Sequence, residues 1–171
     1  MKIGCVKEIK NNEFRVGLTP DNVRAYVAAG HHVYMEAGAG LGSGFQDTEY
    51  VQAGASLLDN AADIWQLVDM MIKVKEPLPE EYPLFREGLI LYTYLHLAAD
   101  KEQMDALLKG KVKAVAYETI QETDGSLPCL APMSQMPAAF PSRKAPNTLK
   151  SASAAKASSW PVCPAPRKPT W

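Results

Sequence analysis

The stretch Leu89-Ile90-Leu91-Tyr92-Thr93-Tyr94-Leu95 decides the fold, because six of its seven residues are apolar or aromatic and none is charged. An unbroken run of this kind is typical of a parallel strand that is buried on both faces. Shorter strand-like runs lie at residues 2–6 and 70–74. We expect the three runs to lie side by side in one parallel sheet.

Helical stretches separate the strand-like runs. Thr19 and Pro20 are typical of a helix N-cap and its first residue, and Gly30 is typical of the end of that helix. We expect strands at 2–8, 32–36, 56–58, 70–74, 89–95 and 112–117, and helices at 21–29, 48–53, 60–68, 80–85 and 100–108. This alternation predicts an α/β fold with a parallel, Rossmann-like (flavodoxin-like) sheet that helices cover on both faces.

The composition is that of one globular domain, with 171 residues, 47% hydrophobic and 22% charged. No apolar run reaches the length of a membrane span and no signal peptide opens the chain, so we expect a cytoplasmic protein. The three cysteines are odd in number and far apart, which argues against a disulfide framework or a zinc site, and we expect no metal.

The chain changes character near Gln135. Residues 1–135 carry a net charge of −7, whereas residues 136–171 carry +6 and contain seven of the 13 prolines. Prolines at this density break helices and central strands. We therefore predict a domain over 1–135 and a disordered tail, rich in Pro, Ala and Lys, over 136–171. The alternative is a natural basic tail that binds nucleic acid, but its cations form no patch, and we expect no nucleic-acid partner.

Three polar side chains follow three of the expected strands. Arg15 lies in the loop after the first strand, Lys75 directly after residues 70–74, and His96 directly after residues 89–95. Parallel strands end at one edge of a sheet, where ligands of open α/β sheets bind. A guanidinium, an ammonium and an imidazole could there bind a small anion and move a proton.

Each of these residues also has a purely structural interpretation. Arg15 could be a solvated surface arginine, Lys75 could extend its amine into water, and His96 could be a hydrogen-bonded structural histidine. Glu118 ends the strand at 112–117 at the same edge, where it could orient Lys75 or His96 or could face water.

The glycine-rich loop at 38–44 invites a nucleotide-binding interpretation, which its spacing does not support. A dinucleotide fingerprint has glycines at positions one, three and six after a strand and an acidic residue at the end of the next one. Position 43 is Ser, and no acidic residue ends a matching second strand.

Several specific motifs carry a family resemblance. Two of them are Lys73-Val74-Lys75-Glu76-Pro77 and Tyr94-Leu95-His96-Leu97-Ala98. The others lie at 1–8, 13–20, 36–45 and 130–134. Together they resemble the N-terminal substrate domain of alanine dehydrogenase, which also occurs in nicotinamide nucleotide transhydrogenase. The resemblance covers residues 1–135.

The resemblance implies reversible oxidative deamination of L-alanine to pyruvate and ammonia with NAD. It implies that Arg15 and Lys75 bind the substrate and that His96 is the catalytic acid/base. Met133 and Ser134 would lie near the NAD cofactor, with Tyr94 and Glu118 supporting the site. The NAD-binding domain of the family is expected to be absent from this chain, so we expect no activity of the chain alone. The resemblance also implies a hexamer for the intact family enzyme.

Two further hypotheses remain, a fragment of the transhydrogenase alpha subunit and a non-enzymatic module that binds 2-oxo acids. For the tail, we expect a frameshift product. One base lost near codon 136 would let residues 136–143 share nucleotides with family sequence in the neighbouring frame. The gene sequence around that codon decides this point.

Overall fold

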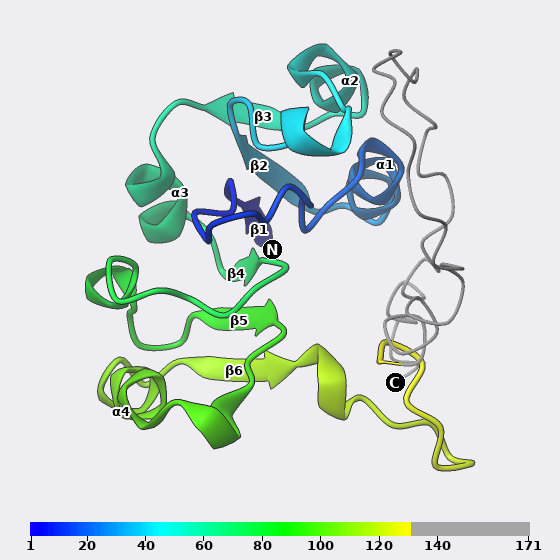
Figure 1. The fold of residues 1–171 in the computed structure, drawn as a ribbon. Helices are drawn as coiled ribbons and strands as arrows, with labels where there is room; N and C mark the ends of the chain where they lie inside the picture. The colour runs from blue at the N-terminus through cyan, green and yellow to red at the C-terminus, as the bar shows by residue number, and fades with distance from the viewer. Residues whose placement is uncertain (131–171) are drawn as a thin grey trace, which may run out of the picture.

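Six parallel strands form a single sheet in a computed structural model that describes residues 1–130 (Figure 1). The strands are numbered along the chain, and their order across the sheet is β3-β2-β1-β4-β5-β6. The strands are β1 (Lys2–Cys5), β2 (His32–Glu36), β3 (Ser56–Leu58), β4 (Met70–Ile72), β5 (Ile90–Thr93) and β6 (Lys113–Ala116). The predicted parallel α/β sheet is therefore confirmed. Its order is that of the doubly wound Rossmann arrangement and differs from the flavodoxin order.

The helices lie between the strands, as expected. They are α1 (Pro20–Ala28), α2 (Asp47–Gln52), α3 (Ala61–Leu67) and α4 (Lys101–Lys109), with short 3₁₀ turns η1 (Leu41–Ser43), η2 (Tyr82–Leu84), η3 (Leu97–Ala99) and η4 (Tyr117–Thr119). The predicted N-cap of the first helix is confirmed: the Thr19 hydroxyl accepts the Asn22 N–H, and the Asn22 side chain accepts the Thr19 N–H. This reciprocal pair satisfies N–H groups that the first turn of a helix leaves unpaired. The helix predicted at 80–85 is only the single turn η2.

The chain reverses its direction across the sheet between β1 and β4. From β1 it proceeds outward through β2 to β3, returns to β4 on the other side of β1, and continues to β5 and β6. The pairs Ile3 with Met70 and Cys5 with Ile72 set the register across this junction. In open α/β sheets the crevice outside the carboxyl ends of the strands at such a junction is where ligands bind.

The core has one apolar cluster on each face of the sheet. On one face, Val23 of α1 and Tyr50 of α2 pack against β1 and β2. On the other, Trp65 of α3 and Leu107 of α4 pack against β4 and β5. Cys5 lies fully buried in the first cluster, and burial there raises the pKa of its thiol to about 12. The thiol is therefore protonated at neutral pH and behaves as a small apolar group.

Coverage of the sheet is incomplete at the β6 edge. Leu91 and Thr93 of β5 are buried, whereas Ile90 and Tyr92 on its opposite face are half-buried. Val115 of β6 is 40% exposed. The prediction that 89–95 is buried on both faces is therefore wrong for one face. The physical reason is that the helices on this face, α1 and α2, lie over β2 and β3, which form the other half of the sheet.

Two parts of the prediction lie outside residues 1–130. These are the tail at 136–171 and the residues expected near a cofactor, Met133 and Ser134. Within residues 1–130, no helix is both long and apolar enough to cross a membrane.

Candidate functional site

The side chains predicted to form the site follow three neighbouring strands. Arg15 lies in the loop after β1, Lys75 in the segment after β4, and His96 in the turn after β5. Because β1, β4 and β5 are adjacent and parallel, their carboxyl ends share one edge of the sheet. The structure thus places all three segments at the junction between β1 and β4 or directly beside it (Figure 1).

Arg15 is held by an acidic neighbour that the sequence analysis did not single out. The Arg15 Nε and Nη2 donate to the two carboxylate oxygens of Glu13, at 2.7 Å for Nε–Oε1, and the Arg15 N–H donates to Oε1 at 3.0 Å. This pairing raises the pKa of the guanidinium and lowers the pKa of the Glu13 carboxyl. A guanidinium carries five N–H donors, so donors remain for a second carboxylate. The spacing of Glu13 and Arg15, two residues apart, was the available signal.

Lys75 is held in place through its main chain. Its carbonyl oxygen accepts a hydrogen bond from the Thr93 hydroxyl at 2.8 Å, and Thr93 is fully buried. Within residues 1–130 the Lys75 amine forms no ion pair. The pKa of Glu13 is lowered first by its hydrogen bond to Arg15 and further by the positive charge of Lys75. The amine therefore acts electrostatically on the loop that carries Arg15.

His96 has an unusual main-chain conformation beside a buried tyrosine. Its φ of 50° and ψ of 34° lie in the left-handed region, which residues other than glycine seldom adopt. The Tyr94 ring stacks on the imidazole with 6.4 Å between ring centroids. Tyr94 is 5% exposed, and its hydroxyl donates to the carbonyl oxygen of Cys129 at 2.7 Å. An ordered aromatic ring thus supports the exposed imidazole from one side.

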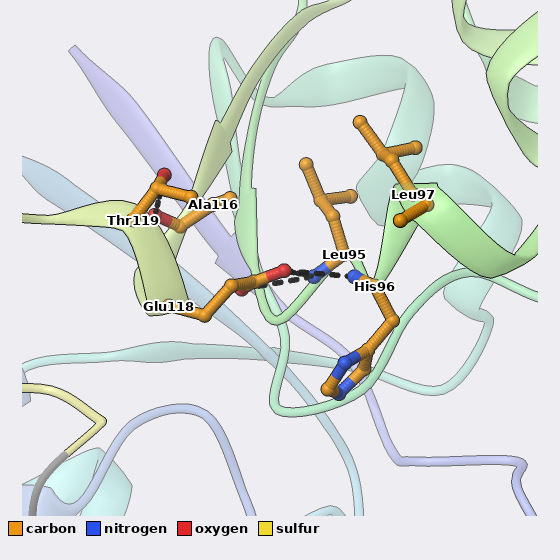
Figure 2. A pocket seen from close by; sticks show the side chains of 7 residues that line it. Leu95, His96, Leu97, Ala116, Glu118 and Thr119 are labelled. Carbon is orange, nitrogen blue, oxygen red and sulfur yellow. Dashed lines mark hydrogen bonds between the residues drawn. The ribbon is translucent and has the colours of Figure 1, made fainter.

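Glu118 stabilises the turn that carries His96. Its carboxylate accepts the N–H of Leu95 at 3.0 Å and the N–H of His96 at 2.8 Å. Figure 2 shows the carboxylate facing these two main-chain groups, with the imidazole directed away from it. The three residues also line a cavity of about 440 Å³. Glu118 thus contacts the main chain of the His96 turn through these hydrogen bonds.

We expect Glu118→Ala to destabilise the His96 turn. The change leaves two N–H groups without their acceptor, which costs about 1–3 kcal/mol for each buried group. Urea unfolding measures the loss, and the matched variant Glu118→Gln, which keeps an acceptor oxygen, should lose less than half as much. Equal losses in both variants would mean that the carboxylate charge, and not the hydrogen bonds, holds the turn.

A buried ion cluster lies behind the site and was missed by the sequence analysis. Lys73 is 1% exposed, and its amine lies 2.5 Å from Glu81 Oε1 and 3.7 Å from Glu8 Oε2. Burial raises the pKa of the Glu8 carboxyl, and the nearby Lys73 charge opposes this rise. A lysine inside the apolar run at 70–74 was the available signal, because such a residue must find buried partners.

The glycine-rich loop does not form a phosphate cradle. The Gly38 N–H donates to both carboxylate oxygens of Asp47, at 2.9 and 3.1 Å, so an anion is already bound to it. A Cβ added at Gly40 would lie 2.5 Å from the Tyr50 ring, which shows that this glycine permits close packing in the core. The loop therefore does not fit a dinucleotide, in agreement with the spacing argument.

The same loop supports the segment that carries Arg15. The Ser43 hydroxyl donates to the carbonyl oxygen of Phe14 at 3.0 Å, and Gly42 lies directly against the Phe14 main chain. Arg15 and Gly42 line a second cavity, of about 270 Å³. The loop thus forms one wall of the space beside the guanidinium.

Substitution of Gly42 should move this wall. A Cβ at Gly42 would lie 2.7 Å from the Phe14 carbonyl oxygen, so Gly42→Ala must displace the neighbouring main chain. We expect a loss of about 1–3 kcal/mol in the free energy of unfolding, measured by urea denaturation. Ser43→Ala, which removes only one hydrogen bond, should lose about 1 kcal/mol. A neutral Gly42→Ala variant would contradict the close approach.

A family model and several sequence relatives match the domain. The model described as "Alanine dehydrogenase/PNT, N-terminal domain" matches residues 4–137. Alanine dehydrogenase of Methanococcus maripaludis is 56% identical over 136 residues, which are 80% of this chain and 36% of that protein. Alanine dehydrogenase of Staphylococcus epidermidis is 57% identical over 136 residues, again 80% of this chain and 36% of that protein. The chain thus spans little more than a third of the length of the curated relatives it matches.

Solved structures show the same fold. An L-alanine dehydrogenase superposes with a TM-score of 0.76 at 53% identity, covering 78% of this chain and 37% of that one. A transhydrogenase from Sinorhizobium meliloti superposes with a TM-score of 0.68 at 28% identity, covering 72% of this chain and 35% of that one. Both similarities cover only the part of those proteins that corresponds to this domain.

Proposed function

Because this chain belongs to the alanine dehydrogenase/PNT N-terminal domain family, we propose that it is the substrate-binding part of an NAD-dependent alanine dehydrogenase. The reaction converts L-alanine, NAD⁺ and water into pyruvate, ammonium, NADH and a proton. One observation supports this proposal most directly. Arg15, Lys75 and His96 follow the carboxyl ends of the adjacent parallel strands β1, β4 and β5.

The three residues have the chemistry that a small 2-oxo acid needs. Arg15 binds the substrate carboxylate through the N–H donors that Glu13 leaves free. The Lys75 amine binds the carboxylate or the carbonyl oxygen as a point charge. The His96 imidazole, which can donate or accept a proton, exchanges a proton with the substrate. Tyr94 and Glu118 hold the histidine in place.

NAD is the proposed acceptor of the hydride, and residues 1–130 offer no fitting cradle for it. The glycine-rich loop is already bound to Asp47. Met133 and Ser134, which we propose to lie near the cofactor, fall outside the described residues. We therefore propose that the chain alone binds substrate and is inactive, because a separate domain must position the cofactor.

Two measurements on the purified chain test this proposal. With L-alanine and NAD, we expect no NADH absorbance above the blank. In calorimetry with pyruvate, we expect binding that Lys75→Ala weakens at least tenfold, since it removes one charge-assisted contact. The control Lys109→Ala, on the exposed side of α4, should bind like the wild type. Turnover by the chain, or no pyruvate binding, would contradict the proposal.

The transhydrogenase remains a second candidate, because a transhydrogenase is among the structural neighbours. The proposed dehydrogenase function, unlike the second candidate, requires that this domain bind a 2-oxo acid. Pyruvate binding that depends on Lys75 favours the dehydrogenase. Pyruvate binding to a protein that lacks any companion NAD domain in its gene would favour a non-enzymatic module.

The remaining features of the proposal concern the gene and the assembly. We propose that the protein is cytoplasmic and that residues 136–171 result from a frameshift in a longer gene. The nucleotide sequence beyond codon 136 tests the latter: family sequence in another frame supports it, and its absence contradicts it. A hexamer is proposed for the intact enzyme only.

A further inference from the structure

The strands β1 and β4 stop pairing just before the candidate site. The last register pair across this junction is Cys5 with Ile72. Beyond it, the chain that continues β4 still pairs with β5, since the Lys73 N–H donates to the Tyr92 carbonyl oxygen at 3.1 Å. On the β1 side, the next main-chain N–H groups have lost their strand partner. Such groups must find another acceptor when they are buried.

Glu8, which follows β1 by three residues, supplies that acceptor. Its Oε1 accepts the Val74 N–H at 2.6 Å. The whole Glu8 residue is 7% exposed, so this hydrogen bond is sheltered from water. One side chain thus replaces the missing strand at Val74, the residue directly before the lysine of the site.

The Glu8 carboxylate is itself held by charge. Lys73 lies between Glu8 and Glu81, and the second carboxylate oxygen of Glu81 accepts the Leu78 N–H at 3.0 Å. The cluster therefore ties the start and the end of the 73–81 segment to β1. Lys75 lies inside this segment, so the segment cannot move independently of Glu8.

Glu8 also borders the space beside Arg15. It lines the 270 Å³ cavity together with Arg15, Gly42 and other residues of the two loops. Its side chain therefore connects the loop that carries the guanidinium with the segment that carries the amine.

We propose that Glu8 is a positioning residue, which sets the place of the Lys75 amine relative to the Arg15 guanidinium. It does so through the main chain of Val74, the residue directly before Lys75, without touching the ligand. This inference rests on the proposed function, because it takes the ligand to be the carboxylate of a small 2-oxo acid.

Two substitutions separate positioning from general stability. Glu8→Gln keeps the side-chain length and an acceptor oxygen. Glu8→Asp keeps the charge but shortens the side chain by one methylene group. Hydrogen exchange measured by NMR on the full chain should show selectively faster exchange at Val74 in Glu8→Asp. The Ile72 amide, inside the regular ladder, serves as the internal reference. Glu8→Gln should retain the protection of the Val74 amide.

Pyruvate affinity, measured by calorimetry, gives the second readout. We expect about tenfold weaker binding for Glu8→Asp and a change of less than about threefold for Glu8→Gln. Equal exchange at Ile72 and Val74 in Glu8→Asp would show general loosening and would overturn the inference. So would unchanged exchange at both amides. If the wild-type chain does not bind pyruvate, the proposed function fails, while the exchange data still decide whether Glu8 holds the segment.

Discussion

We expect Lys73→Met to lower the free energy of unfolding by about 3–5 kcal/mol at pH 7, because it removes the cation from a buried ion cluster. The Lys73 side chain is 1% exposed, and the side chains of its two partners, Glu81 and Glu8, are 7% and 2% exposed. Without the ammonium, two carboxylates remain in the core with no counter-charge. Removing one partner of a buried pair is far more damaging than replacing the whole pair by neutral groups.

Urea unfolding of matched variants measures this effect. The triple variant Lys73→Met/Glu8→Gln/Glu81→Gln carries no charge at this place and should regain at least half of the loss. A loss below about 1 kcal/mol in the single variant would mean that water or another cation reaches the carboxylates. The comparison also excludes lost side-chain packing as the cause, since all the variants contain Met at position 73.

The loss in Lys73→Met should depend on pH in a defined direction. Burial already raises the pKa of Glu8 above its usual value of 4.5, and Lys73 opposes this rise. A carboxyl group whose pKa is higher in the folded state binds its proton more tightly there, so the free energy of unfolding falls as pH rises through that pKa. We therefore expect the variant to be closest to wild type near pH 4.5 and furthest from it at neutral pH. Urea midpoints across this range measure the trend, and a loss independent of pH would contradict it.

The second large effect concerns ligand binding. We expect Arg15→Ala to weaken pyruvate binding at least 100-fold, because it removes two charge-assisted hydrogen bonds to the carboxylate. Arg15→Lys should lose about tenfold, since an ammonium keeps the charge and lacks the planar fork. The control Arg24→Ala removes an exposed arginine on α1, paired with Asp21, and should bind like the wild type.

Glu13 complicates the interpretation of Arg15→Ala, and a double variant separates the two contributions. Once the Arg15 side chain is removed, the Glu13 carboxylate has lost its charged partner and repels an incoming anion. Arg15→Ala/Glu13→Gln removes that repulsion and should recover part of the affinity, but less than the wild type has. Calorimetry with pyruvate compares the wild type, Arg15→Ala and the double variant. Full recovery in the double variant would show that Arg15 only neutralises Glu13 and does not bind the ligand.

Local patterns in the sequence were sufficient to predict most of the helices and strands. The β2 and β3 strands were predicted with their observed bounds, and Thr19 was identified as the N-cap of α1. These features depend on residues close together in the chain, such as the Thr19–Asn22 hydrogen bonds, which propensity and capping rules describe. The predicted positions of Arg15, Lys75 and His96 after three strands depend on the same local patterns.

The pairings between distant residues were not accessible from one sequence. Glu8 and Val74 are 66 positions apart, and Glu118 and His96 are 22 apart. Which carboxylate reaches which N–H depends on the strand order and on where β1 and β4 separate, and neither leaves a local signal. The expected end of β4 at residue 74 was two residues late for this reason, since a side chain replaces the strand there.

The sequence by itself therefore determined the class of the fold, the caps and the residues at the ends of the strands, because hydrophobic periodicity and turn chemistry act over a few residues. Only the tertiary structure decided which carboxylates hold Lys75 and His96 in place and that one face of β5 remains half-buried. These outcomes follow from burial: a polar group removed from water must pair with whatever the fold brings near it, however far away that partner is along the chain.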